Sequence, residues 1–174
     1  MASELRVDRI IPVNGVPTGG GGSILQVMPI YGLTAPITTS TTTTLTSMGL
    51  SGTITPLRTD SKIYISINVM FGGDIDNDSH GYVTAGFNVR RAVAGIAGHV
   101  NVFTMGGSQE ILDLGGQSRM KTTNWNFIDS PNTTSQVTYD MEYVMGTTAS
   151  RSLFVGRSSL PNNGGQMILM EVSG

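Results

Sequence analysis

In the segment Lys62–Phe71, apolar side chains recur at every second residue, and no other feature of the chain constrains the fold as strongly. Successive side chains of a β-strand point to opposite faces, so a period of two predicts a strand with one buried face. The same alternation recurs in Tyr82–Arg90 and Val137–Met145. The apolar positions of the first segment are Ile63, Ile65, Ile67, Val69 and Phe71. These patterns predict a protein built from sheets.

Weaker strand patterns, separated by turns rich in Gly, Pro and Asn, fill most of the remaining chain. They cover Ser23–Ile30, Thr38–Leu45, Gly52–Pro56, Val100–Met105, Thr123–Ile128, Arg151–Gly156 and Gln166–Val172. No segment shows a sustained helical stripe, and the ambiguous Glu110–Met120 is interrupted by Gly115-Gly116. The Thr-rich Thr38–Thr46 suits either a solvent-facing strand or a loop. We predict an all-β fold, an antiparallel β-sandwich or jelly roll.

The alternation also predicts which side chains form the core. We expect the following to lie between the two sheets: Ile65, Ile67, Phe87, Trp125, Tyr139 and Met141. The run Met167–Met170 is apolar on both faces, which predicts either a central strand or a strand with one face against another subunit. Trp125 and Phe127 share one face of a strand, and a sugar-stacking platform is the alternative to a core position for them.

Four consecutive glycines, Gly19, Gly20, Gly21 and Gly22, divide the chain. Such a run predicts a flexible hinge between an N-terminal arm (residues 1–18) and a β-domain (residues 23–174). The arm is too short to bury its own apolar side chains, and Pro12 and Pro17 favour an extended path. It is either a disordered terminus or a docking peptide that pairs as a strand with a partner. The candidate docking residues are Leu5, Arg6, Val7, Asp8, Arg9, Ile10, Ile11 and Val13.

Composition narrows the function classes. Of the 174 residues, 13 % are charged and the net charge is −2, which argues against a nucleic-acid partner. So few charges, together with ten methionines, suggest surface buried against other subunits. The absence of Cys excludes disulfides, thiolate zinc sites and a Cys nucleophile. No apolar run reaches membrane-spanning length and the N-terminus is too charged for a signal peptide, so no membrane insertion is expected.

The acidic segment around Asp74, Asp76, Asp78 and His80 resembles the start of a calcium loop. The EF-hand pattern then requires Gly and Glu where this chain has Ser79 and Ala85, so the motif fails. We interpret the segment as a surface loop that is a candidate for receptor contact. A calcium site completed by a neighbouring loop stays an alternative.

The sequence offers little catalytic chemistry. Asp140 and Glu142 share the outward face of one strand, an arrangement compatible with a glycosidase pair, but coincidence is the simpler interpretation. His80 and His99 lie in no recognisable triad, and the Gly-rich segments lack the residues of a phosphate loop. We therefore expect no enzyme activity and no cofactor.

The arm with its hinge, Glu4–Val27, resembles short tail-fibre-like virion proteins of tailed bacteriophages, especially phages of marine bacteria and cyanobacteria. The segments Leu50–Phe71, Tyr82–Arg91, Phe127–Tyr139 and Gln166–Val172 are similar to the same family. The resemblance implies a trimeric, all-β virion component that is assembled in the bacterial host cytoplasm and contacts other virion proteins through its arm. A tail fibre, fibre tip or adaptor involved in host attachment is the main expectation. A capsid decoration, cement or head-fibre protein is the alternative, and a lectin-like module that binds host-surface glycan is the more distant one.

Overall fold

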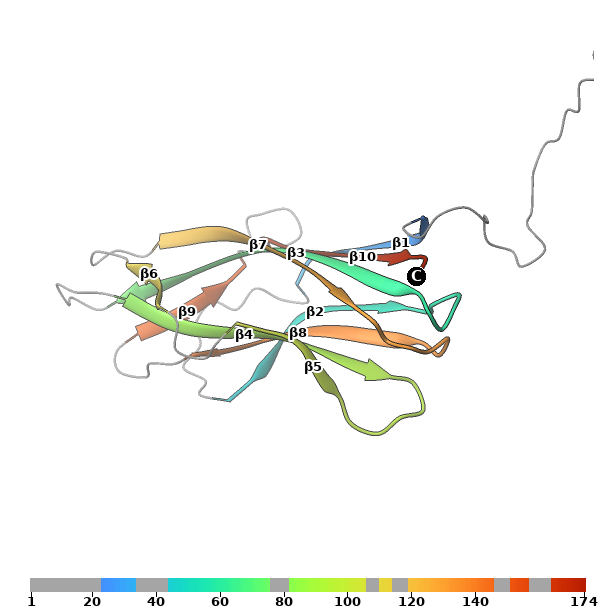
Figure 1. The fold of residues 1–174 in the computed structure, drawn as a ribbon. Coiled ribbons are helices and arrows are strands. Elements are labelled where there is room, and N and C mark those ends of the chain that lie inside the picture. Colours follow the sequence, from blue (N-terminus) through green and yellow to red (C-terminus); the bar gives the residue numbers. More distant parts are fainter. Residues whose placement is uncertain are drawn as a thin grey trace, which may run out of the picture.

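In the computed structural model the chain forms two antiparallel β-sheets that face each other (Figure 1). The structure describes residues 23–33, 44–75, 82–105, 110–113, 119–145, 151–156 and 164–174. The arm and the glycine hinge lie outside these residues, as do Asp76, Asp78 and His80. The strands are β1 (Ile24–Tyr31), β2 (Thr46–Ile54), β3 (Lys62–Ile75), β4 (Tyr82–Val93), β5 (Val100–Met105), β6 (Glu110–Asp113), β7 (Arg119–Asp129), β8 (Val137–Met145), β9 (Arg151–Val155) and β10 (Gly165–Val172).

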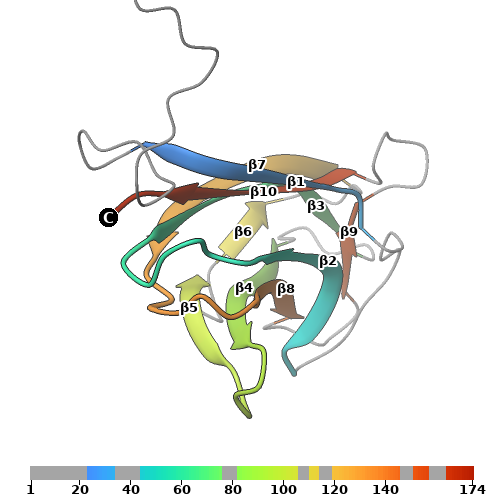
Figure 2. The ribbon, with the colours of Figure 1, turned by 90° about the vertical axis from the view of Figure 1, so that its right-hand side faces the viewer.

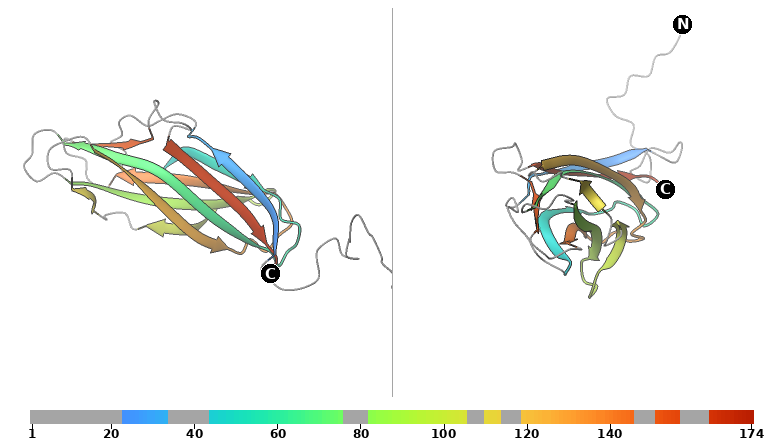
Figure 3. Two further views of the ribbon diagram at one scale, coloured as in Figure 1. Left: turned by 90° about the horizontal axis from the view of Figure 1, so that it is seen from above. Right: turned by 90° about the vertical axis from the view of Figure 1, so that its left-hand side faces the viewer.

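The strand order is that of a jelly roll. One sheet, here called sheet 1, has the order β1-β10-β3-β7, and β9 pairs with the far end of β3. The other, sheet 2, has the order β2-β8-β4-β5, and β6 pairs with the start of β4. The chain passes from one sheet to the other between β1, β2, β3 and β4, so neighbours in sequence pack face to face. Figure 2 and the right panel of Figure 3 show the two layers end-on. The prediction of an antiparallel sandwich of jelly-roll type is confirmed.

The core lies between the sheets and contains every side chain expected there. The six predicted residues are at most 9 % exposed, and the alternate residues from Ile63 to Phe71 are equally buried. Aromatic rings join the sheets, because Phe71 and Trp125 from sheet 1 pack on Phe87 from sheet 2, with centroids 5.0 and 5.1 Å from it. β10 is central, between β1 and β3, as one of the two interpretations of Met167–Met170 required.

Two strand predictions need correction. The strand expected at Gly52–Pro56 begins at Thr46 and ends at Ile54, and its pairing with β8 shifts register between Ser47 and Ser51. Gly49, with φ of 73°, lies at this irregularity, which hides the alternation in the sequence. β6 was not predicted, because its four residues show no period and form a strand only by pairing with β4.

β1 packs closely on sheet 2 because Gly52 has no side chain. A Cβ atom at this position would lie 2.6 Å from Cδ1 of Ile30, closer than carbon atoms approach in proteins. The glycine therefore leaves the space between β1 and β2 that the Ile30 side chain occupies.

Candidate functional site: the outer face of sheet 1

A row of four apolar or aromatic side chains crosses the outer face of sheet 1. Val27 of β1 pairs with Met170 of β10, which pairs with Tyr64 of β3, and Tyr64 pairs with Ile128 of β7. Paired residues of neighbouring strands share a face of the sheet. The alternate residues of these strands fill the core, so this row points away from the opposite sheet.

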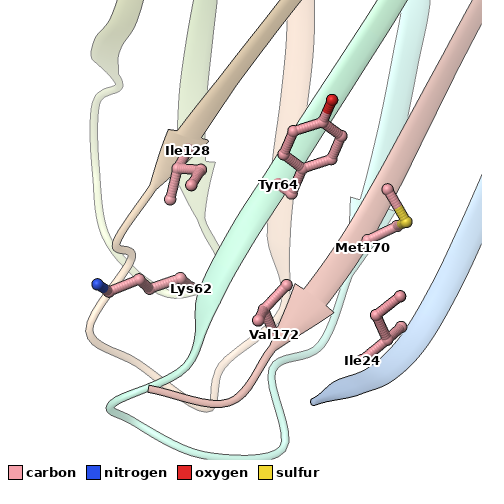
Figure 4. A pocket seen from close by; sticks show the side chains of 6 residues that line it. All are labelled: Ile24, Lys62, Tyr64, Ile128, Met170 and Val172. Carbon is pink, nitrogen blue, oxygen red and sulfur yellow. The ribbon is translucent and has the colours of Figure 1, made fainter. Parts of the chain in front are cut away.

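A second row lies beside the first, nearer to the two chain ends. Ile24 of β1 pairs with Val172 of β10, and Val172 pairs with Lys62 of β3. Between the two rows is a hollow of about 280 Å³, lined by Ile24, Lys62, Tyr64, Ile128, Met170 and Val172. Figure 4 shows that these side chains come from four of the five strands of the sheet, β1, β10, β3 and β7.

The two rows expose their apolar side chains to an unusual degree. Ile24 and Ile128 are 60 % and 63 % exposed, and Val27 is 48 % exposed. Scattered exposed apolar residues are ordinary, but a contiguous group spanning four strands is typical of an interaction surface. We call this surface the apolar patch; it comprises Ile24, Val27, Tyr64, Ile128, Met170 and Val172, with the cation Lys62 among them.

Toward the opposite end the same face becomes mixed. The Tyr64 hydroxyl donates a hydrogen bond to Oδ1 of Asn126 at 2.9 Å, and Asn124 and Asn68 lie in the next positions along their strands. Ile168 and the exposed Tyr31 lie in the same rows as these polar residues. The apolar patch itself lies at the end of the sheet where Ser23 and Ser173 meet. There the backbone N–H of Ser173 donates to the carbonyl of Ser23 at 2.9 Å, which brings the C-terminus beside the start of the domain (Figure 3).

A buried carboxylate fixes β10 beneath the patch. Glu171, between the outward Met170 and Val172, points inward and is fully buried. Its Oε1 accepts a hydrogen bond from the backbone N–H of Leu57 at 2.7 Å, and its Oε2 accepts one from the side-chain amide of Gln26. These bonds tie β10 to β1 and to the connection that leads into β3, so the residues flanking Glu171 hold fixed positions on the outer face.

A second carboxylate, which is 11 % exposed, fixes the end of β7 and ties the two sheets together. Asp129 follows the outward Ile128, and Nη1 of Arg91 on β4 contacts both of its oxygens at 2.7 Å. The Tyr139 hydroxyl of β8 donates to Oδ2 of Asp129, also at 2.7 Å. Burial, and secondarily the charge of Asp129, raise the pKa of Tyr139 well above its ordinary value. The phenol therefore stays protonated and acts as a donor in this tie.

The residues predicted from the acidic segment are only partly within the described structure. Asp74 lies in β3, which is longer than the sequence indicated, and its backbone pairs with Ser152 of β9. His99 is exposed in the connection between β4 and β5.

Two pairs of residues had a functional alternative in the sequence: the aromatic Trp125 and Phe127, and the acidic Asp140 and Glu142. Trp125 is buried in the core, so the sugar-stacking platform is wrong for this residue. Phe127 stacks on Phe103 of β5 with ring centroids 4.8 Å apart and joins the edges of the two sheets. Asp140 and Glu142 share the outer face of sheet 2, as predicted, but both are bound by Arg90.

The sequence analysis did not single out Tyr64, Ile128 or Met170 as surface residues of interest. The sequence did indicate that all three side chains point outward, because they occupy the positions that alternate with the core residues of their strands. That they form one row is shown only by the pairing register of the strands.

No group of three His, Asp or Glu side chains that could hold a metal ion occurs among the described residues. Within the same residues, no helix is long and apolar enough to cross a membrane.

No protein-family model matches the chain, and no curated protein matches it. Among solved structures, the VP2 subviral particle of infectious bursal disease virus is similar with a TM-score of 0.43 and 10 % identity, over 86 % of this chain and 33 % of that one. The T13 viral particle of the same virus has a TM-score of 0.42 and 12 % identity, over 97 % of this chain and 39 % of that one. The Eiger TNF from S. frugiperda has a TM-score of 0.39 and 10 % identity, over 84 % of this chain and 92 % of that one. The chain thus spans about a third of the length of the first viral chain, and similarity at this level concerns the arrangement of strands only.

Proposed function

We propose that this chain is a structural protein of a bacteriophage virion, a component of a tail fibre or of its tip or adaptor. The observation that carries the proposal is the apolar patch on the outer face of sheet 1. A contiguous exposed apolar surface stabilises nothing in an isolated domain, whereas it stabilises an assembly in which it is covered. The resemblance of the arm and of several strands to tail-fibre-like proteins supplies the identity of that assembly.

The occupant of the patch is a second copy of the same chain, in a homotrimer. The patch carries a single charged residue, Lys62, and lies in a chain of which 13 % is charged, so two copies can approach there with little repulsion. Subunit interfaces are depleted of charge at their centres and enriched in Tyr and Met, and the patch has Tyr64 and Met170. The threefold state itself follows from the family resemblance.

The arm anchors the trimer to other virion proteins. It joins the domain at Ser23, directly before the patch residue Ile24. Its apolar residues, among them Ile10 and Ile11, gain free energy when an extended arm adds to a partner sheet. Arm attachment and self-association are therefore separable.

Immunogold labelling of purified phage particles tests the location. An antibody raised against residues 23–174 should label the tail. Label on the head would instead support a capsid decoration protein. Particles that carry no label, and in which mass spectrometry finds no peptide of this chain, would contradict the virion proposal. Deletion of residues 1–22 should leave a folded trimer that no longer joins the particle.

Sedimentation at micromolar concentration tests the trimer. We expect Met170→Asp to give a folded monomer, because it places a charge at the centre of the patch. The matched control Asn124→Asp adds the same charge beside Asn68, at the other end of the same face, and should remain trimeric. A monomeric wild-type protein, or equal effects of the two variants, would contradict the assignment of the patch.

A further inference from the structure

A hollow on the outer face of sheet 2 lies on the side of the molecule opposite the apolar patch. It measures about 600 Å³ and is lined by Ser47, Ser51, Arg90, Ala92, Gly98, His99, Thr138 and Asp140. These residues come from β2, β8 and β4 and from the connection that precedes β5. The β4–β5 hairpin bends away from sheet 1 (Figures 1 and 2), and Gly98 and His99 of this hairpin form one side of the hollow.

Arg90 and Asp140, which line the hollow, belong to a fixed ion-pair cluster that also includes Glu142. Nη2 of Arg90 lies 2.9 Å from Oδ2 of Asp140, and Nη1 lies 3.0 Å from Oε1 of Glu142. The Ser47 hydroxyl donates to Oδ1 of Asp140 at 2.8 Å, and the Asn88 amide donates to Oε2 of Glu142 at 3.1 Å. The donors come from two strands that flank β8, so the carboxylates are held in place before any ligand arrives.

The neighbouring residues hold the cluster from the β5 side. The Asn88 amide also donates to Oδ1 of Asn101 at 2.9 Å, and the Thr104 hydroxyl donates to Oδ1 of Asn88 at 2.9 Å. Asn88 is 1 % exposed, and Asp140 and Glu142 are 8 % and 5 % exposed. Buried ion pairs of this kind contribute little net stability compared with apolar side chains, so their presence in a hollow favours a binding role.

The cluster retains capacity for a ligand. Oδ1 of Asp140 accepts one hydrogen bond from Ser47 and Oδ2 accepts one from Arg90, although a carboxylate oxygen can accept two. The Arg90 side chain remains 35 % exposed and can donate further hydrogen bonds. The hydroxyl of Thr138 and the imidazole of His99 add groups that can both donate and accept. The Ser51 hydroxyl donates to the carbonyl of Tyr139 at 3.2 Å and can still accept a hydrogen bond.

We propose that this hollow binds a neutral saccharide. Sugar hydroxyls both donate and accept hydrogen bonds, so they match a floor on which acceptors of Asp140 alternate with donors of Arg90. The cluster of Arg90, Asp140 and Glu142 has a formal charge of −1, which disfavours anionic sugars. The proposal does not rest on the assembly role, because the hollow and the apolar patch lie on different sheets.

The test is binding of the full chain to an array of neutral hexose oligosaccharides printed beside sialylated and sulfated versions of the same oligosaccharides. We expect binding to neutral spots, weakened by acidic substituents. Ser51→Trp should weaken it at least about tenfold, because Ser51 is an exposed residue of β2 and an indole there fills the hollow.

The control variant is Asn124→Trp, which adds the same side chain at an exposed strand position on the opposite outer face. It should bind as the wild type does, and thermal melts should show that both variants are folded. The proposal is overturned by an array without neutral binding, by preference for the acidic versions, or by full binding of Ser51→Trp.

Discussion

The outer face of sheet 1 exposes apolar side chains, whereas the outer face of sheet 2 buries charged ones. Ile128 and Ile24 lie mostly in solvent at the end of sheet 1. Asp140 and Glu142 are more than nine-tenths buried on sheet 2, beneath Arg90. Both faces are made of antiparallel strands with the same alternation, and in both the inward residues form one common core.

This difference indicates that the residues at the outward positions were not selected for the stability of the isolated domain. Exposed apolar area contributes nothing to the unfolding free energy of a monomer, and buried charges lose hydration that their pairing only partly replaces. Each outer face is better explained by the contact that we propose for it: a second copy at the apolar patch, and a polyhydroxylated ligand at the hollow. The contrast can be tested one residue at a time.

The largest effect is expected where an inner position of sheet 1 is compared with an outer one. Ile67→Ala removes a fully buried side chain and should lower the unfolding free energy by about 2–5 kcal/mol. Ile128→Ala should change it by less than about 0.5 kcal/mol in a sample diluted to the monomer. Urea denaturation measures both, and equal losses would mean that the patch is packed against its own chain.

The next effect concerns the charged cluster of sheet 2. Arg90→Ala leaves Asp140 and Glu142 close together and nearly buried without their cation, which should cost about 3 kcal/mol. The control is Arg58→Ala, which removes an exposed ion pair with Asp60 of the same 2.9 Å length and should have no measurable effect. Equal melting temperatures for the two variants would show that the cluster is not desolvated.

The smallest effect concerns the tie that joins the two sheets and belongs to neither outer face. Tyr139→Phe removes one hydrogen bond to the Asp129 carboxylate and should cost about 1.5 kcal/mol at pH 7. Because burial raises the pKa of Tyr139 above its ordinary value of 10.0, the unfolded chain loses this proton first as pH rises. The contribution of the hydroxyl is thus complete below pH 10 and decreases above it.

Chemical denaturation of wild type and Tyr139→Phe between pH 7 and pH 11 checks this dependence. The difference between their unfolding free energies should be constant up to about pH 10 and then narrow. A difference that widens at high pH would contradict a protonated, buried phenol.

Much of the strand pattern could be predicted because alternation is a local property. The bounds of β5 and β8 were predicted to the residue, and β3 and β4 were found with their correct inner faces. The failures have local causes as well. Gly49 shifts the pairing of β2 and obscures its period, and β6 is too short to show one. The arm, the hinge, Asp76, Asp78 and His80 stay predictions, since they lie outside the described residues.

The sequence by itself determined that the chain forms strands and which side of each strand enters the core, since both follow from the chemistry of residues two positions apart. Only the tertiary structure decided what the outward sides do. Tyr64, Ile128 and Met170 are far apart in the chain and become one row through the register of β3, β7 and β10. Asp140 and Glu142 were predicted to lie on an outward face, and they are nearly buried there because Arg90 of β4 pairs with both. Whether an outward side chain is exposed, covered or paired depends on its cross-strand neighbours, and the strand order and register of the fold determine which residues these neighbours are.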